Sequence, residues 1–116
     1  MPRDARAYLA DIIESCDAIR GLDLAGYEDN HLVRSSVERE FIIIGEAAAA
    51  LGRVAPEAFD AITRARRIVD FRNQLTHEYP TVADAVVWAI AEHDVPVLRR
   101  ECVSLMQRVA PNDEAG

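Results

Sequence analysis

The residues best suited to chemistry lie in one stretch of eight, from Arg72 to Tyr79, which contains Arg72, His77 and Tyr79. An arginine can direct two donors at a phosphate, and an imidazole can exchange a proton near neutral pH. These groups together suit cleavage of a phosphodiester without a metal ion. The same residue types also form ordinary helix ends, with a solvated polar face and a packed aromatic ring, so spacing alone leaves both interpretations open.

The helix that must position this stretch is expected to begin near Thr63 and to end at Pro80. Its apolar stripe consists of Ile68, Phe71 and Leu75. At about 100° per residue, four polar residues fall within an arc of about 140° that avoids this stripe. They are Arg72, Asn73, Thr76 and His77. We therefore expect one polar face to carry the whole set, and replacement of Arg72 or His77 to change stability little.

A basic patch surrounds the same stretch. The whole chain has a formal net charge of -7, which argues against a protein that coats nucleic acid by neutralising many phosphates. Between residues 63 and 79, however, four arginines and one histidine face only two acidic residues. Three of these arginines, Arg64, Arg66 and Arg67, form a candidate RNA-binding patch, although a charge run is also typical of a solvated face.

Length and composition indicate one domain of residues 1–109, followed by a disordered tail of residues 110–116. Cys16 and Cys102 occupy apolar helical positions and are expected to be buried thiols in a reducing compartment. The N-terminus lacks the succession of charged, apolar and small residues of a signal peptide, and no apolar run is near the 18 residues of a membrane span, so we expect a cytoplasmic protein. The three histidines lack metal-ligand spacing, and no metal or other cofactor is expected.

Hydrophobic periodicity predicts helices over most of the remaining chain. The expected ranges are residues 4–20, residue 28 or 29 to residue 51, residues 56–62, and a long last helix that Pro96 should kink. Gly21 and Gly52 are expected to end the first two helices, with a linker holding Gly26 between them. No β-alternation is present. The predicted fold is therefore an all-α bundle of four main helices plus one short helix.

The second long helix raises the question of a partner. Ile42 and Ile43 widen its apolar face, which suggests a second neighbour. Gly45 is small enough for another helix to approach closely, and that helix could belong to this chain or to a dimer mate. Glu46 could orient an arginine across such a contact or form an ordinary surface ion pair.

The motif R-x-x-x-x-H-x-Y at residues 72–79 and the IIGEA segment at residues 43–47 resemble the HepT toxins, across roughly residues 4–108. These are the toxins of HepT/MntA (type VII) toxin–antitoxin systems, in the HEPN superfamily of helical ribonucleases. The resemblance implies a HEPN-like bundle and a homodimeric, metal-independent endoribonuclease whose motifs meet across the subunit interface. It makes Arg72 and His77 the catalytic pair, supported by Asn73 and Thr76. Relatives often carry a tryptophan-containing turn near residues 64–67, which this chain lacks.

The resemblance also implies a protein partner. MntA, a minimal nucleotidyltransferase, would transfer AMP from ATP to the motif tyrosine, Tyr79, and silence the toxin. A different function remains open, in which a non-catalytic helical module binds a nucleotide or docks the nucleotidyltransferase. His77 distinguishes the ribonuclease from the binding module, because proton transfer needs this residue and docking does not.

Overall fold

The computed structural model describes residues 3–77 and 83–109, in which the chain forms six helices and no strand. Their bounds are α1 (Ala5–Arg20), α2 (Leu24–Asp29), α3 (His31–Val54), α4 (Pro56–Asp60), α5 (Ala65–His77) and α6 (Asp84–Arg108). The all-α prediction is confirmed, and four of the helices are long, as expected. Two short helices occur where one was predicted. The expected tail, residues 110–116, lies outside the described residues.

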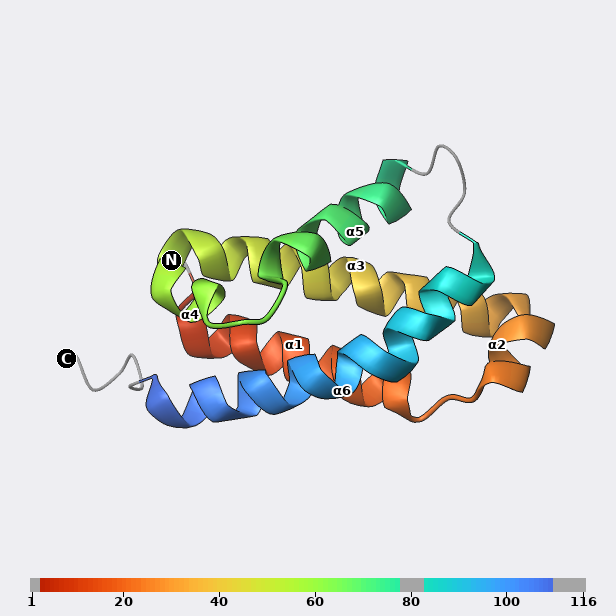
Figure 1. Cartoon of the computed structure of the whole chain (residues 1–116), viewed down its shortest axis with the longest axis horizontal. Coiled ribbons are helices and arrows are strands. Elements are labelled where there is room, and N and C mark those ends of the chain that lie inside the picture. Colours follow the sequence, from red (N-terminus) through yellow and green to blue (C-terminus); the bar gives the residue numbers. More distant parts are fainter. Residues whose placement is uncertain (1–2, 78–82, 110–116) are drawn as a thin grey trace.

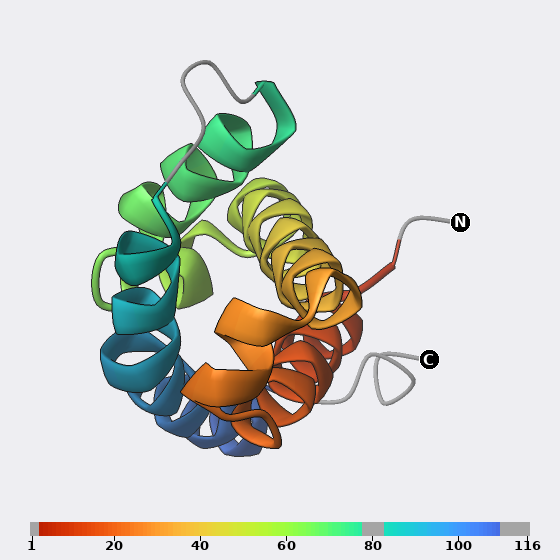
Figure 2. The ribbon, with the colours of Figure 1, turned by 90° about the vertical axis from the view of Figure 1, so that its right-hand side faces the viewer.

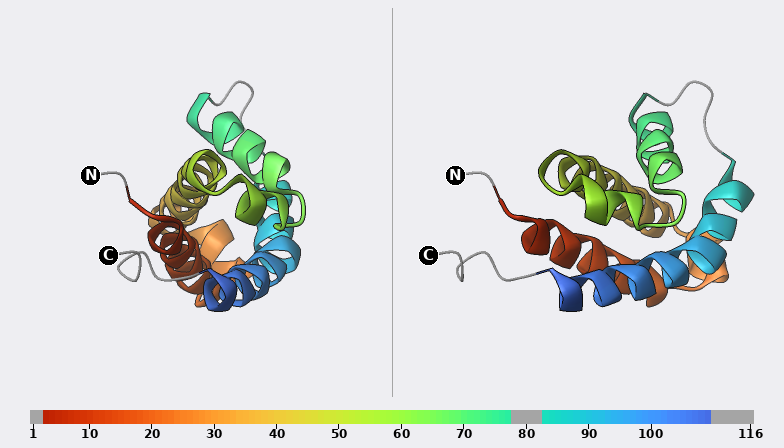
Figure 3. Two further views of the ribbon diagram at one scale, coloured as in Figure 1. Left: turned by 90° about the vertical axis from the view of Figure 1, so that its left-hand side faces the viewer. Right: turned by 60° about the vertical axis from the view of Figure 1, so that its left-hand side comes forward.

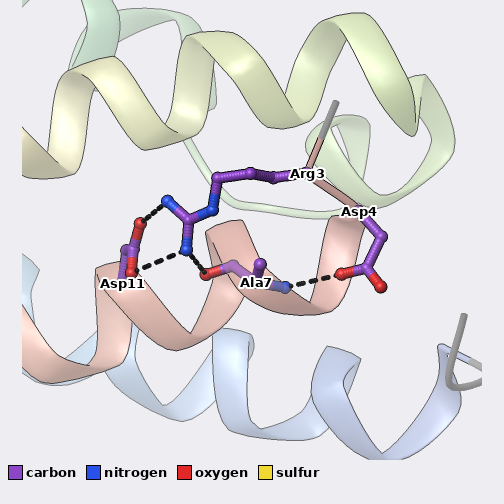
Figure 4. A network of polar contacts seen from close by, with 4 residues as sticks. All are labelled: Arg3, Asp4, Ala7 and Asp11. Carbon is purple, nitrogen blue, oxygen red and sulfur yellow. Dashed lines mark hydrogen bonds and ion pairs between the residues drawn. The ribbon is translucent and has the colours of Figure 1, made fainter. Parts of the chain in front are cut away.

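The first helix begins as predicted because Asp4 caps it (Figure 4). The Asp4 carboxylate accepts a hydrogen bond from the Ala7 backbone N–H at 2.9 Å, which satisfies one of the unpaired donors at the helix start. Arg3 pairs with Asp11 and donates to the Ala7 carbonyl (Figure 4). Gly21 is the C-cap, also as predicted.

The prediction of a linker without helix between the first two long helices is wrong, because this segment contains α2. The Asp23 carboxylate caps this helix by accepting from the Gly26 N–H at 2.6 Å. Tyr27 is fully buried, with its ring centroid 5.3 Å from that of Trp88, and so anchors α2 to the core. The Arg34 guanidinium also donates to the carbonyls of Tyr27 and Glu28, so α2 is held by contacts with α3 as well.

Gly52 does not end α3, which continues to Val54. A Cβ atom at Gly52 would lie 3.3 Å from the Phe59 ring, so the glycine admits α4 close to the helix. The prediction that Gly52 ends the helix is therefore wrong, because this glycine serves the packing of α4 and not helix termination.

The core forms where α1 packs against both α3 and α6, while α5 packs on α3 (Figures 1 and 2). Cys16 and Cys102 are buried and free, and burial raises the pKa of each thiol to about 12. Both thiols therefore stay protonated at neutral pH and are poor nucleophiles. None of the described helices has the length and hydropathy needed to span a bilayer.

The last helix, α6, runs through Pro96, and its ribbon changes direction about midway along (Figure 1). Its C-terminal end is tied to α1, since the Arg6 guanidinium donates to the carbonyls of Met106 and Val109. A second tie joins Arg99 of α6 to Asp17 of α1. The rigid pair of α1 and α6 leaves α5 as the long helix with the fewest neighbours.

Candidate active site

The crossing of α3 and α5 is centred on Gly45. A Cβ atom at this position would lie only 2.2 Å from the Arg72 Cβ and 3.4 Å from the Ile68 carbonyl oxygen. Any larger residue would therefore force the helices apart. The helix that approaches Gly45 belongs to the same chain, which answers the question that the sequence left open.

Arg72 lies in this crossing, so it is more buried than the polar arc of α5 alone indicated. Only 22% of its side chain is exposed, because the aliphatic stem passes over the space left by Gly45. Its Nε–H is buried and has no hydrogen-bond partner among the described residues. An unsatisfied buried donor costs about 1–3 kcal/mol, a cost that an anionic ligand could remove.

Of the residues that the structure describes, Glu46 on α3 is the one that pairs with Arg72, with 3.9 Å between the Arg72 Nη1 and the Glu46 Oε2. This separation is too long for a hydrogen bond. The Glu46 side chain is 61% exposed, so the pair contributes little to stability. Glu46 therefore faces the guanidinium without occupying its donors.

The two residues predicted to support the catalytic pair make no hydrogen bond to the Arg72 guanidinium among the described contacts. Asn73 and Thr76 are both exposed. The Thr76 hydroxyl lies 3.1 Å from the Arg72 carbonyl and 3.2 Å from the Asn73 carbonyl, so it bonds to the helix backbone and not to the guanidinium. His77 is the last residue of α5, and its side chain lies outside what the structure describes, as do Tyr79 and Pro80.

The three arginines of the candidate RNA-binding patch lie on different surfaces in the structure. The guanidinium carbon of Arg66 lies 5.8 Å from the centroid of the Phe59 ring, a cation–π contact with α4. Arg64 and Arg67 instead line a cleft between α5 and α6. The three side chains therefore do not form one surface.

A pair of hydrogen bonds that joins the residues before α5 to α6 was not predicted from the sequence. The Glu101 carboxylate of α6 accepts from the Thr63 N–H at 2.9 Å and from the Thr63 hydroxyl at 2.6 Å. The next residue, Arg64, has a φ of 59°, a left-handed conformation that costs a non-glycine residue free energy. Thr63 and Glu101 are 38 residues apart, and no local pattern could have paired them.

The described residues contain no group of three His, Cys, Asp or Glu side chains placed to hold a metal ion. The cation that the structure places at the crossing is Arg72, whose stem is shielded and whose guanidinium makes no hydrogen bond to the part of the chain that the structure describes. A guanidinium in this setting can bind a phosphate and stabilise the charge that develops on it.

A family model described as Ribonuclease HepT-like matches residues 9–105 of the chain. Putative RNase MJ1380 of Methanocaldococcus jannaschii is 31% identical over 103 residues, covering 85% of this chain and 94% of that protein. Putative RNase MJ1216 of the same organism is 26% identical over 116 residues, covering 97% and 95%. No solved structure shows significant similarity. Because the family model spans most of the chain, including Gly45 and the residues of α5, this protein belongs to the HepT-like ribonuclease family.

Proposed function

We propose that this protein is the toxin of a toxin–antitoxin pair and acts as a metal-independent endoribonuclease. The observation that carries the proposal is the placement of Arg72, whose stem packs over Gly45 while its buried Nε–H has no partner within residues 3–77 and 83–109. Membership of the HepT-like ribonuclease family supports the reaction class, as do relatives whose names are putative RNases. Arg72 is the proposed phosphate-binding residue and His77 the proposed proton-transfer residue.

In the proposed reaction, the 2′-hydroxyl of the RNA attacks the adjacent phosphorus and the bond to the 5′-oxygen breaks. A base must take the hydroxyl proton, a cation must stabilise the phosphorane, and an acid must protonate the leaving oxygen. One chain contributes only one motif histidine. A homodimer would contribute two, and its two-fold symmetry would place both motifs at one interface.

Cleavage should persist in excess EDTA and leave a 2′,3′-cyclic phosphate or a 3′-phosphate, because the nucleophile is the RNA's own hydroxyl. The ends can be identified by mass spectrometry of a short cleaved oligonucleotide. An otherwise identical RNA with a 2′-O-methyl group at the cleaved position is the control and should stay intact. Activity lost on chelation and restored by magnesium would contradict this mechanism.

The regulatory part of the proposal concerns Tyr79, which lies outside the described residues. A MntA-like nucleotidyltransferase would join the phenol oxygen to the α-phosphorus of ATP, with pyrophosphate leaving and the phenol proton passing to a base. The added phosphodiester anion would compete with RNA for the donors of Arg72, seven residues earlier. The support for this step is the resemblance of the R-x-x-x-x-H-x-Y motif to that of HepT toxins.

Tyr79→Phe should keep most of the ribonuclease activity and escape silencing, since only the acceptor oxygen is removed. After incubation with the nucleotidyltransferase and ATP, intact-mass measurement should show added AMP on the wild-type protein and none on the variant. Tyr27→Phe is the matched control, because Tyr27 is fully buried and its substitution should leave the modification unchanged. AMP on another residue, or a modified protein that still cleaves RNA at full rate, would refute the switch.

A further inference from the structure

A cleft of about 600 Å³ lies between α5 and α6, with α3 at its base. It exists because α5 packs chiefly on α3, and α5 stands away from the first half of α6 (Figure 3). Its apolar lining includes Phe41, Phe71, Val86 and Ile90. The Phe41 and Phe71 rings meet edge to face with centroids 5.3 Å apart, which holds Phe71 in place. This volume is typical of a small-molecule site.

The polar lining of the cleft carries both hydrogen-bond donors and acceptors. Arg64, Arg67 and Gln74 provide donors, and Asp70 and Asp94 provide carboxylate acceptors. Among the described residues, none of these arginines and aspartates forms an ion pair. The charged groups are therefore free to contact a ligand that has an apolar body, an edge with donors and acceptors, and a negative charge.

We propose that this cleft binds an unpaired base of single-stranded RNA, with a neighbouring phosphate of the same strand on Arg64 and Arg67. A nucleobase has flat apolar faces for the walls and an edge with both donors and acceptors for Asp70, Asp94 and Gln74. Single-stranded RNA is commonly bound by contacts of this kind, because its bases are free to leave the stack. A base in a duplex is held in the stack by its neighbours and its pairing partner, so a site for a single extruded base favours unpaired RNA.

The backbone at the mouth of the cleft supports this assignment. Arg64 is held in the left-handed region next to Thr63, which both of the Glu101 carboxylate oxygens fix to α6. Glycine would make the same turn without strain. An arginine here lines the cleft with a cation in spite of the free-energy cost of its backbone conformation.

This inference rests on the proposed ribonuclease activity and names its substrate as unpaired RNA. Arg72 and Phe71 are adjacent on α5 and therefore lie about 100° apart around its axis. The cleft and the Arg72 site thus occupy two flanks of one helix. A strand anchored by a base on one flank would cross α5 to present its phosphate on the other.

The first experiment blocks the cleft from its exposed side. Val86 is 50% exposed and lines the cleft, so Val86→Trp should fill it without disturbing the core. Val54, 45% exposed and outside the cleft, provides Val54→Trp as the matched control. The probe is a 2′-O-methyl RNA oligonucleotide, which the proposed reaction cannot cleave, compared with an abasic oligonucleotide of the same backbone.

The wild-type protein and Val54→Trp should bind the base-bearing probe about tenfold more tightly than the abasic one, the usual scale for one stacked base. Val86→Trp should bind both equally. A preference that survives in Val86→Trp, or is absent from the wild type, would overturn the base site. A change in the mass of Val86→Trp by light scattering without RNA would also overturn it, by showing that a second copy fills the cleft.

The second experiment compares adjacent arginines. Arg67→Gln should weaken binding and reduce the slope of log affinity against log salt by about 0.7, the value for one phosphate contact in a single strand. Arg66→Gln should leave the slope unchanged, because Arg66 stacks on Phe59. Equal slopes for both variants would count against the cleft. Cleavage of unmodified RNA is measured separately, so a wild type that prefers the base-bearing probe but cuts nothing contradicts only the ribonuclease proposal.

Discussion

Replacing Arg72 by alanine should lower RNA cleavage by about a hundredfold or more and leave a folded protein. The loss corresponds to about 2.7 kcal/mol of transition-state stabilisation, the scale of one positioned electrostatic donor. Alanine keeps the Cβ atom that lies against Gly45, and it removes a buried Nε–H for which the described residues offer no partner. We therefore expect the lost packing of the arginine stem to be partly offset, with stability changing by about 1 kcal/mol or less.

Arg72→Lys is the matched control for charge. Lysine keeps the aliphatic stem and a positive charge but lacks the fork of donors, so its cleavage rate should fall between those of the wild type and Arg72→Ala. Initial rates on one RNA and thermal unfolding by circular dichroism provide the two measurements. An Arg72→Ala protein that is folded and cleaves at the wild-type rate would remove Arg72 from the mechanism.

Gly45→Ala should damage both stability and cleavage. Alanine gains about 1 kcal/mol of helix propensity over glycine. That gain is outweighed because the new Cβ would lie 2.2 Å from the Arg72 Cβ, and overpacking of this kind costs about 1–3 kcal/mol. Since α5 must shift to relieve the clash, Arg72 moves with it, and misplacement by about 1 Å can cost about a hundredfold in rate.

Gly21→Ala is the control for the glycine itself. A Cβ atom there would lie 3.8 Å from its nearest neighbour, and the residue has an ordinary φ of -79°. Urea unfolding should show little change or a small stabilisation for Gly21→Ala and a clear loss for Gly45→Ala. Equal stability of the two variants would show that the helices do not need glycine at their crossing.

The long helices could be predicted because their signals are local. Asp4 and Gly21 bound α1 as N-cap and C-cap, and apolar periodicity marks the buried faces. The errors arose where tertiary contacts overrode local patterns. Gly52 is a residue type that commonly ends helices, but here it makes room for the Phe59 ring. The helix α2 was missed because Tyr27, which anchors it, is buried by residues distant in sequence.

For the site, the sequence predicted which residues matter better than where they lie. Helical angles placed Arg72 on a polar arc, but they contain no information about Gly45, 27 positions away, which turns that arc into a buried crossing. Similarly, consecutive arginines suggested one patch, and the Phe59 ring separates Arg66 from its neighbours. The α5–α6 cleft has no sequence signature, because it results from the absence of close packing between two helices.

The most direct test of the central claim is the initial rate at which purified wild-type protein and His77→Ala cleave the same RNA in excess EDTA. His77 is the last residue of α5, the helix that carries Arg72, and it is the proposed proton-transfer residue. Its replacement by alanine should therefore lower the cleavage rate by about a hundredfold or more. The wild-type protein should cleave, and the folded variant should be nearly inactive. Equal rates for the two proteins, or no cleavage of any RNA by folded wild-type protein, would contradict the assignment of this chain as a ribonuclease that acts through Arg72 and His77.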